Sequence, residues 1–299
     1  MTVRPDASTS EVSPSLDSSE ASVAALRAEI ERLETAVAAE RRTLERELAI
    51  ARRIQLSLMP SVAPIRPGWE FATGYRAARS IGGDFYDLYG LGPEPDAPDA
   101  PVGLAIADVT GKGVTAALLM AFSRAVLRSA AYNADGPLDA LRRTNGVLAT
   151  DIQAGLFLTA LVGRLDPASG RLRYASAGHE PPVLVRAGSS SAEPAGGSMV
   201  GLFPTMDADP EAAEHTIDLE AGDVLVWYTD GVTDARDAAG DRFGEMRLHA
   251  TLERWTRGTP PTRLAAEGVV AAIFDAVDAF VAGEPQADDV TILVIRRSP

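Results

Sequence analysis

The sequence predicts an α+β domain of layered sheets and helices, preceded by a long N-terminal helix. Three observations support this fold class. Glycine and proline are absent between about residues 20 and 59, where Ala, Leu, Glu and Arg dominate. After Pro67, short apolar runs of strand length alternate with turn residues. Helical segments separate blocks of these runs instead of following each one, which favours largely antiparallel sheets.

Composition excludes several classes of function. The chain has 299 residues and a formal net charge of −14, which argues against nucleic acid or an anionic membrane as the main partner. Cysteine is absent, so disulfides and thiolate metal sites are excluded. We expect no apolar run of the about 20 residues that span a bilayer, and the N-terminus lacks the pattern of a signal peptide. We therefore expect a cytoplasmic protein with no membrane segment.

The first 60 residues are predicted to form two parts. Residues 1–19 are rich in Ser, Thr, Pro and acidic residues, and we expect them to be disordered. Residues 20–60 are expected to form a linker helix that Pro60 ends. Apolar residues recur there at the heptad spacing of a coiled coil, at Leu26, Ile30, Leu33, Val37, Leu44 and Leu48. We expect this seam to form a homodimer; the alternative is a single amphipathic helix. The last apolar residues shift to another face and are predicted to pack on the domain: Ile50, Ile54 and Leu58.

Residues 61–299 are predicted to form the layered domain. Strands are expected at 71–77, 85–89, 102–109, 157–165, 171–176, 183–185, 216–219, 224–228 and 290–295. Helices are expected at 114–132, 138–152 and 263–281. The segment Asp-Pro-Ala-Ser-Gly at 166–170 predicts a hairpin turn. The Gly- and Ser-rich segment 187–198 is predicted to be a mobile loop.

Four aspartates each end or follow an apolar run and lie in a turn of small residues: Asp84, Asp108, Asp230 and Asp288. A fold that gathers several carboxylates makes them repel one another, so some must take up protons or bind cations. Oxygen ligands without cysteine suit hard ions such as Mg²⁺ or Mn²⁺. The pattern therefore points to metal-assisted chemistry on a phosphate ester.

Short motifs around these aspartates match other known sites only in part. The turn at 82–85 lacks the second acidic residue of nucleotide cyclases. The turn at 108–113 lacks the first glycine and the final Ser or Thr of a P-loop. The loop at 228–234 lacks one aspartate of the haloacid dehalogenases. Gly111 and Gly113 are instead expected to bend the chain into the next helix. Lys112 between them is expected to face solvent, with contact to a substrate phosphate as the alternative.

Taken together, five segments are far more specific than any single motif. In their order they resemble the metal-dependent serine/threonine phosphatase family (PPM), at 77–87, 105–121, 157–185, 222–244 and 286–296. Within it they are similar to the bacterial branch of the stage II sporulation phosphatase and the stress-response sigma-factor phosphatases. The resemblance covers residues 60–297, and residues 52–60 look like the linker helix that commonly precedes this domain. It implies a four-layer α-β-β-α sandwich with two mainly antiparallel sheets.

The resemblance also implies a site for two Mn²⁺ or Mg²⁺ ions. Asp84 matches the first metal-binding aspartate, and Asp108 matches the bridging one, with the Val109 carbonyl as a further ligand. Asp230 and Asp288 match the carboxylates of the other ion. Asp234 matches a position linked to a third, weak ion. Asp289 replaces a common Asn and is expected to support the ligands.

Two departures from the eukaryotic relatives stand out. Thr110 occupies the place of a His proposed there as general acid. No clear equivalent of their phosphate-binding Arg is present, and Arg76 and Arg79 are the nearest candidates. We therefore expect low intrinsic activity without a partner. His179, in a turn, is more readily explained as structural than as a general acid.

The resemblance implies a phosphatase that hydrolyses phosphoserine or phosphothreonine with a metal-activated water. Its substrate in this branch would be a small anti-sigma-factor antagonist in a partner-switching pathway. The alternative is a coil-dimerised, non-catalytic regulator that keeps the fold, and a phosphatase for small phosphoesters is a third interpretation. The four matching carboxylates favour the enzyme, because a scaffold has no need of them.

Overall fold

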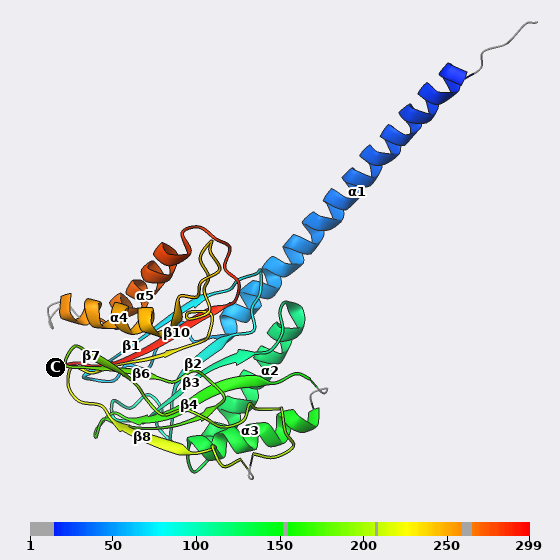
Figure 1. Ribbon diagram of the computed structural model, residues 1–299. Coiled ribbons are helices and arrows are strands. Elements are labelled where there is room, and N and C mark those ends of the chain that lie inside the picture. The colour runs from blue at the N-terminus through cyan, green and yellow to red at the C-terminus, as the bar shows by residue number, and fades with distance from the viewer. Residues whose placement is uncertain (1–14, 152–154, 207–208, 259–264) are drawn as a thin grey trace, which may run out of the picture. The chain divides into compact units, whose positions relative to one another are not determined.

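A computed structural model describes residues 15–151, 155–206, 209–258 and 265–299. The chain divides into two compact units, Met1–Ile50 and Ala51–Pro299. The division falls inside helix α1 (Ser15–Leu58), which runs from the first unit into the second (Figure 1). Of the tail predicted for residues 1–19, residues 1–14 lie outside the described residues. Residues 15–19 belong to α1, so the predicted start of the helix at residue 20 is too late.

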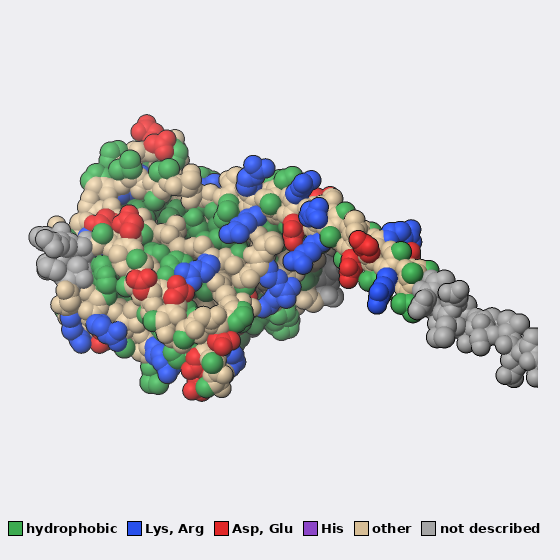
Figure 2. Space-filling view, turned by 90° about the horizontal axis from the view of Figure 1, so that it is seen from above, with side chains coloured by type: hydrophobic (Ala, Val, Ile, Leu, Met, Phe, Trp, Pro, Cys, Tyr) green, Lys and Arg blue, Asp and Glu red, His purple; other side chains and the backbone are tan. Residues whose placement is uncertain are grey.

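In the first unit, α1 exposes the apolar seam that the sequence predicts. Its residues are between 52 and 64% exposed: Leu26, Ile30, Leu33, Val37 and Leu44. Figure 2 shows apolar side chains at the surface of this helix between acidic and basic ones. Apolar side chains in a row on a helix are usually covered by a partner surface. Pairing of two chains through this seam stays a prediction.

The second unit is a sandwich of two five-stranded antiparallel sheets (Figure 1). The first sheet has the order β1 (Trp69–Arg76), β10 (Val290–Arg297), β9 (Val224–Tyr228), β6 (Val183–Arg186), β7 (Ser189–Ala192). The second sheet has the order β2 (Phe85–Gly90), β3 (Val102–Val109), β4 (Leu158–Asp166), β5 (Arg171–Ala177), β8 (Glu214–Asp218). The predicted hairpin joins β4 and β5.

Two helices cover the outer face of each sheet, which confirms the predicted four-layer sandwich. On the first sheet lie α4 (Gly244–Gly258) and α5 (Ala266–Val281), and on the second lie α2 (Val114–Asn133) and α3 (Pro137–Asp151). A third apolar layer fills the space between the sheets and includes Leu104, Tyr174 and Trp227, each fully buried. The loops that connect the strands are thus carried by a rigid scaffold.

Two elements differ from the sequence prediction. The segment predicted as a mobile loop over 187–198 contains β7, which pairs with β6. The carboxylate of Glu253 on α4 also accepts hydrogen bonds from the backbone N–H and hydroxyl of Ser190, which holds the strand down. The sequence does not predict α4, because its charged residues mask a narrow apolar face that buries Leu248 and Leu252. The helix predicted from residue 263 begins at Ala266, and residues 263–264 lie outside the described residues.

Helix α2 is long and apolar enough, by length and composition, to cross a membrane, contrary to the expectation that no apolar segment of that length is present. It is the one helix in the described ranges that meets this test. A single such helix is weak support for a membrane segment, because core helices share these properties. One face of α2 packs into the core through Ala116, Leu119, Met120, Ser123 and Leu127.

The last turns of α1 belong to the second unit and pack there with a different face from the predicted one. Ile50 and Ile54, both predicted to pack on the domain, are 50% and 58% exposed, and Leu58 is half-buried. Gln55 and Met59 are buried instead, each 4% exposed. Met59 enters the apolar layer beneath α2, and the Gln55 amide bonds to backbone groups of Gly82. The prediction for Ile54 is therefore wrong, because Gln55 can satisfy polar backbone groups that an isoleucine would leave unpaired.

Candidate metal centre

The four predicted aspartates lie at the same end of the two sheets. Asp84 directly precedes β2, and Asp108 is near the end of β3, its antiparallel neighbour. Asp230 follows β9, and Asp288 precedes β10, an antiparallel pair in the other sheet. In antiparallel neighbours, the end of one strand lies beside the start of the next. The topology therefore gathers carboxylates that are far apart in the sequence.

Asp84 is the most deeply buried of the four, at 1% exposed. Its Oδ2 accepts hydrogen bonds from the hydroxyls of Thr229 (2.7 Å), directly after β9, and Thr291 (2.6 Å), in β10 of the other sheet. Burial, and then the charge of Asp108, raise the pKa of Asp84 well above its usual range, while the two hydroxyl bonds oppose the shift. A buried carboxylate in this position is strongly stabilised by a nearby cation.

The other carboxylates act on one another as well. Burial, with the charge of Asp230 as the next cause, raises the pKa of Asp108 to about 7. A side-chain hydrogen bond with Asp84 works in the opposite direction. Burial also raises the pKa of Asp230, and the charge of Asp288 adds to it. The negative charges of the cluster are therefore not fully neutralised, and a divalent cation would reduce the repulsion between the carboxylates.

The donor atoms of this cluster fit a hard divalent cation, since all are oxygens. The Asp84 loop also approaches the Val109 carbonyl closely, because a Cβ on Gly83 would lie 2.7 Å from that oxygen. In the described part of the chain, no three Asp, Glu or His side chains converge closely enough to enclose an ion as they stand. Asp108, Asp230 and Asp288 are each partly exposed, whereas Asp84 is buried.

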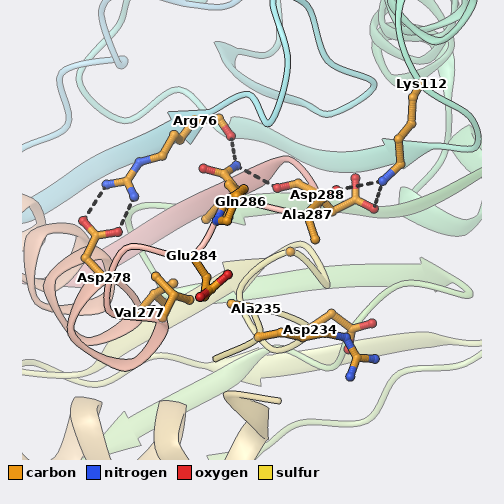
Figure 3. A pocket seen from close by; sticks show the side chains of 15 residues that line it. Arg76, Lys112, Asp234, Ala235, Val277, Asp278, Glu284, Gln286, Ala287 and Asp288 are labelled. Carbon is orange, nitrogen blue, oxygen red and sulfur yellow. Dashed lines mark hydrogen bonds and ion pairs between the residues drawn. The ribbon is translucent and has the colours of Figure 1, made fainter. Parts of the chain in front are cut away.

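Lys112 lies against Asp288 of this cluster (Figure 3). Its Nζ donates to the Ala287 carbonyl at 2.8 Å and to Asp288 Oδ2 at 3.0 Å. The Lys112 and Asp288 side chains are each 43% exposed. Burial raises the pKa of Asp230, and the Lys112 ammonium opposes that rise. The expectation of a solvent-facing lysine is therefore confirmed, since Lys112 is exposed. Its charge is in addition paired with a carboxylate of the cluster.

Asp289 holds the loop that carries Asp84. It is 8% exposed, and its two carboxylate oxygens accept hydrogen bonds from the backbone N–H groups of Ala78 (2.8 Å) and Gly83 (2.6 Å). These bonds fit the expectation that Asp289 supports the metal ligands by holding the loop before Asp84 in place. Asp234 lies next to the cluster, where its N–H donates to the Asp230 carbonyl at 2.7 Å.

Neither His179 nor Thr110, which occupies the place of the general acid proposed in eukaryotic relatives, is poised to donate a proton. The Thr110 hydroxyl donates to the Phe157 carbonyl (2.8 Å) and accepts from the Phe157 N–H (3.0 Å). His179 is 6% exposed, and its Nδ1 lies 2.8 Å from the hydroxyl of Thr159. Burial lowers the pKa of His179 to about 4. A histidine that stays neutral near pH 7 and pairs with a neighbouring strand fits the structural role that the sequence favours.

A cavity of about 200 Å³ lies beside Lys112 and Asp288 (Figure 3). Arg76 lines it, but its guanidinium donates to both carboxylate oxygens of Asp278 and stacks 4.5 Å from the centre of the Phe274 ring. Gln286 Nε2 donates to the Arg76 carbonyl (2.8 Å) and to the Asp288 carbonyl (2.7 Å). The guanidinium of this candidate phosphate-binding arginine is thus already paired.

Several supporting residues escape sequence reasoning: Gln55, Thr229, Gln286 and Thr291. Each of them bonds to a residue that is distant in the chain. Gln286 bonds within its own loop as well. Their residue types are common in loops and strands, so a single sequence gives no signal for them. The placement of Thr229 directly before Asp230 is the one weak hint.

Comparison with known proteins identifies similar chains. The model of the stage II sporulation protein E (SpoIIE) family matches residues 98–298. Protein IcfG of Synechocystis sp. is 30% identical over 283 residues, which cover 84% of this chain and 42% of that protein. Phosphoserine phosphatase RsbU of Bacillus subtilis is 26% identical over 197 residues, 66% of this chain and 56% of that protein. The chain thus spans about half the length of the curated relatives it matches.

Solved structures show the same fold. The SiaA-PP2C domain of Pseudomonas aeruginosa aligns with a TM-score of 0.73 at 20% identity, over 87% of this chain and 98% of that one. The RsbU and RsbW domains of Rv1364c from Mycobacterium tuberculosis align with a TM-score of 0.64 at 26% identity, over 79% and 62% of the two chains. The two-sheet sandwich therefore follows a known architecture.

Proposed function

Since this chain belongs to the SpoIIE family, within the PPM phosphatases, we propose that it is a protein phosphatase acting on phosphoserine or phosphothreonine. The observation that carries the proposal is the cluster of mutually repelling carboxylates at one end of the sandwich, Asp84, Asp108, Asp230 and Asp288. Burying unpaired charges costs stability. A scaffold with no use for a cation would have no reason to retain them.

Two Mg²⁺ or Mn²⁺ ions are the proposed cofactors. Asp84, Asp108 and the Val109 carbonyl would hold one ion, Asp108 would bridge, and Asp230 and Asp288 would hold the other. A weak third ion would involve Asp234. When bound, the ions would supply Lewis acidity and a water of lowered pKa for in-line attack on phosphorus. Oxygen donors and a partly solvated site favour these hard ions over softer ones.

The chain's own residues would keep the ligands in position. Thr229 and Thr291 donate to the same oxygen of Asp84, so that carboxylate cannot rotate freely. Asp289 fixes the preceding loop, and Gln286 fixes the backbone at Asp288. Ligands locked by neighbouring hydrogen bonds bind ions more tightly, because less motion is lost on binding.

Two further groups are needed, one to bind the phosphoryl oxygens and one to protonate the leaving alcohol. The candidates for both are already bonded to other residues. Arg76 is paired with Asp278, and the Thr110 hydroxyl is bonded to Phe157. We therefore expect slow turnover by the isolated protein and faster turnover with a partner that completes the site. Thr110 is a poor proton donor in any case, since a hydroxyl titrates far above physiological pH.

The proposed substrate is a small anti-sigma-factor antagonist phosphorylated on Ser or Thr, in a cytoplasmic partner-switching pathway. Support comes from two relatives named as phosphoserine phosphatases, RsbU and RsbP of Bacillus subtilis. The proposed assembly is a homodimer formed through the exposed seam of α1. A phosphorylated protein substrate would approach the loop end of the sandwich, where Asp108, Asp230 and Asp288 are partly exposed.

One assay tests the proposal. The full chain is incubated with p-nitrophenyl phosphate and with phosphorylated antagonists from the same genome, with Mn²⁺, with Mg²⁺ and with EDTA. Ion-dependent release of phosphate from at least one antagonist is expected. Hydrolysis of the small ester alone would favour a phosphatase for small phosphoesters. No hydrolysis by a correctly folded protein, with either ion, would favour the non-catalytic regulator.

A further inference from the structure

Lys112 is the chain's only lysine, and its charge lies among the carboxylates of the candidate site. The ammonium donates to Asp288 Oδ2 at 3.0 Å and to the Ala287 carbonyl at 2.8 Å (Figure 3). It also stabilises the charged form of Asp230. One side chain thus interacts with both carboxylates that the proposed second ion would use.

We propose that the Lys112 ammonium is a built-in counter-cation that competes with the second divalent ion for Asp288. The inference rests on the proposed function, because the ion site is assigned there. In one state of the site, Lys112 neutralises Asp288. In the other, a divalent ion binds Asp288 and Lys112 moves away. Affinity for the second ion is then set by the difference between these two pairings.

The strength of the pair suits such an exchange. Both side chains are 43% exposed, and ion pairs this accessible are worth roughly 1 kcal/mol or less. A divalent ion can displace a contact of that strength, whereas a fully buried pair would exclude it. A contact at the upper end of that range, about 1 kcal/mol, would weaken ion binding by about fivefold.

The surroundings allow the side chain to leave. The cavity of about 200 Å³ beside Asp288 is lined in part by Lys112 itself and gives the ammonium a place to move. A lysine has a compact charge on a flexible four-carbon stem, so it can reposition without moving the backbone. An arginine would grip the carboxylate with two parallel hydrogen bonds and would be harder to displace.

The first test measures ion affinity directly by calorimetry with Mn²⁺. Lys112→Met removes the charge while keeping the length of the side chain. We expect the Lys112→Met variant to bind the second ion about fivefold more tightly than the unchanged protein, which corresponds to about 1 kcal/mol. Lys112→Arg should bind that ion no more tightly than the unchanged protein. Arg76→Met is the matched control, because it removes one positive charge from the same cavity but from a pair with Asp278.

The second test follows Lys112 itself. Reductive methylation with a ¹³C label keeps the positive charge and marks one lysine plus the α-amino group. We expect the Lys112 methyl signal to move as Mg²⁺ is added and to stop moving when the site is saturated. The same titration of Lys112→Met identifies the α-amino signal by elimination.

The outcomes separate the two proposals. If ions bind and phosphate is released, but Lys112→Met and Arg76→Met have equal affinity, the counter-cation role is overturned. A methyl signal that stays fixed at saturating Mg²⁺ overturns it too. If the unchanged protein binds no divalent ion, the proposed function fails and this inference fails with it.

Discussion

Gln55 and Gly82 are joined by two hydrogen bonds, one from the side-chain Nε2 to the carbonyl (2.6 Å) and one from the backbone N–H to Oε1 (3.2 Å). Gly83, the next residue, donates to Asp289. The short loop before Asp84 is therefore held from two sides, by the end of α1 and by the segment that precedes β10. A shift of either support would move the Asp84 ligand.

Loss of Gln55 should therefore affect both stability and ion binding. Gln55→Leu leaves buried N–H and C=O groups of Gly82 without partners, which should cost about 1–3 kcal/mol in the free energy of unfolding. Urea unfolding and Mg²⁺ calorimetry would measure the two effects. Ile54→Ala is the control, since an exposed neighbour should change stability by less than about 0.5 kcal/mol. Equal effects of the two substitutions would rule out a special role for the Gln55 amide.

Removal of a single carboxylate charge should abolish most of the activity. Asp108→Asn and Asp230→Asn each withdraw a negative ligand, and we expect turnover to fall by about a hundredfold or more. EDTA should have the same effect on the unchanged protein. Circular dichroism would verify that the variants fold. An Asp108→Asn protein with full activity would contradict the assigned site.

The neighbouring Asp288 and Asp289 should behave differently. Asp288→Asn should weaken ion binding and turnover much more than Asp289→Asn, because Asp288 faces the cluster while Asp289 bonds to the backbone at Ala78 and Gly83. An Asn at position 289 can still accept one of those two bonds. Titration with Mn²⁺ and steady-state rates would compare the variants. If the two losses match, the ligand assigned in this pair is wrong.

The stabilisation of the fold by divalent ions should depend on pH. Burial raises the pKa of Asp108 from 3.8 to about 7, so between these values the folded state holds a proton that the unfolded state has lost. In EDTA, stability should therefore fall as pH rises through this window. A divalent ion prefers the ionised carboxylates, so the rise in melting temperature on adding Mg²⁺ should be larger at about pH 8 than at about pH 5. Calorimetric melting would test this, and a rise independent of pH would contradict it.

The seam of α1 should control the oligomeric state. Leu33→Glu combined with Leu44→Glu places charges at two exposed apolar positions of the heptad pattern, and we expect a monomer. Sedimentation would report the mass, and ion titration would report the site. A variant that stays dimeric would exclude this seam. A monomer with unchanged ion affinity and turnover would limit the helix to dimerisation.

Local sequence patterns predict most of the scaffold. The strands at 102–109 and 224–228 form with the predicted bounds, because each is an apolar run between turn residues. The turns that carry the candidate ligands are equally visible in the sequence. The rotation of α1 that buries Gln55 and exposes Ile54 is not, since both faces contain apolar residues and tertiary packing decides between them. The pairing of Lys112 with Asp288 joins residues 176 positions apart, which no local pattern contains.

The bonds from Thr229 and Thr291 to Asp84 have a consequence beyond the site. They link the strand ends of the two sheets at the edge of the sandwich. Any movement of one sheet relative to the other must therefore displace Asp84, a proposed ion ligand. Substitutions in the apolar interior, far from every carboxylate, should therefore weaken the affinity for divalent ions. This effect should be measurable before the yield of folded protein falls. Affinity for the ion would then report how well the two sheets pack against each other.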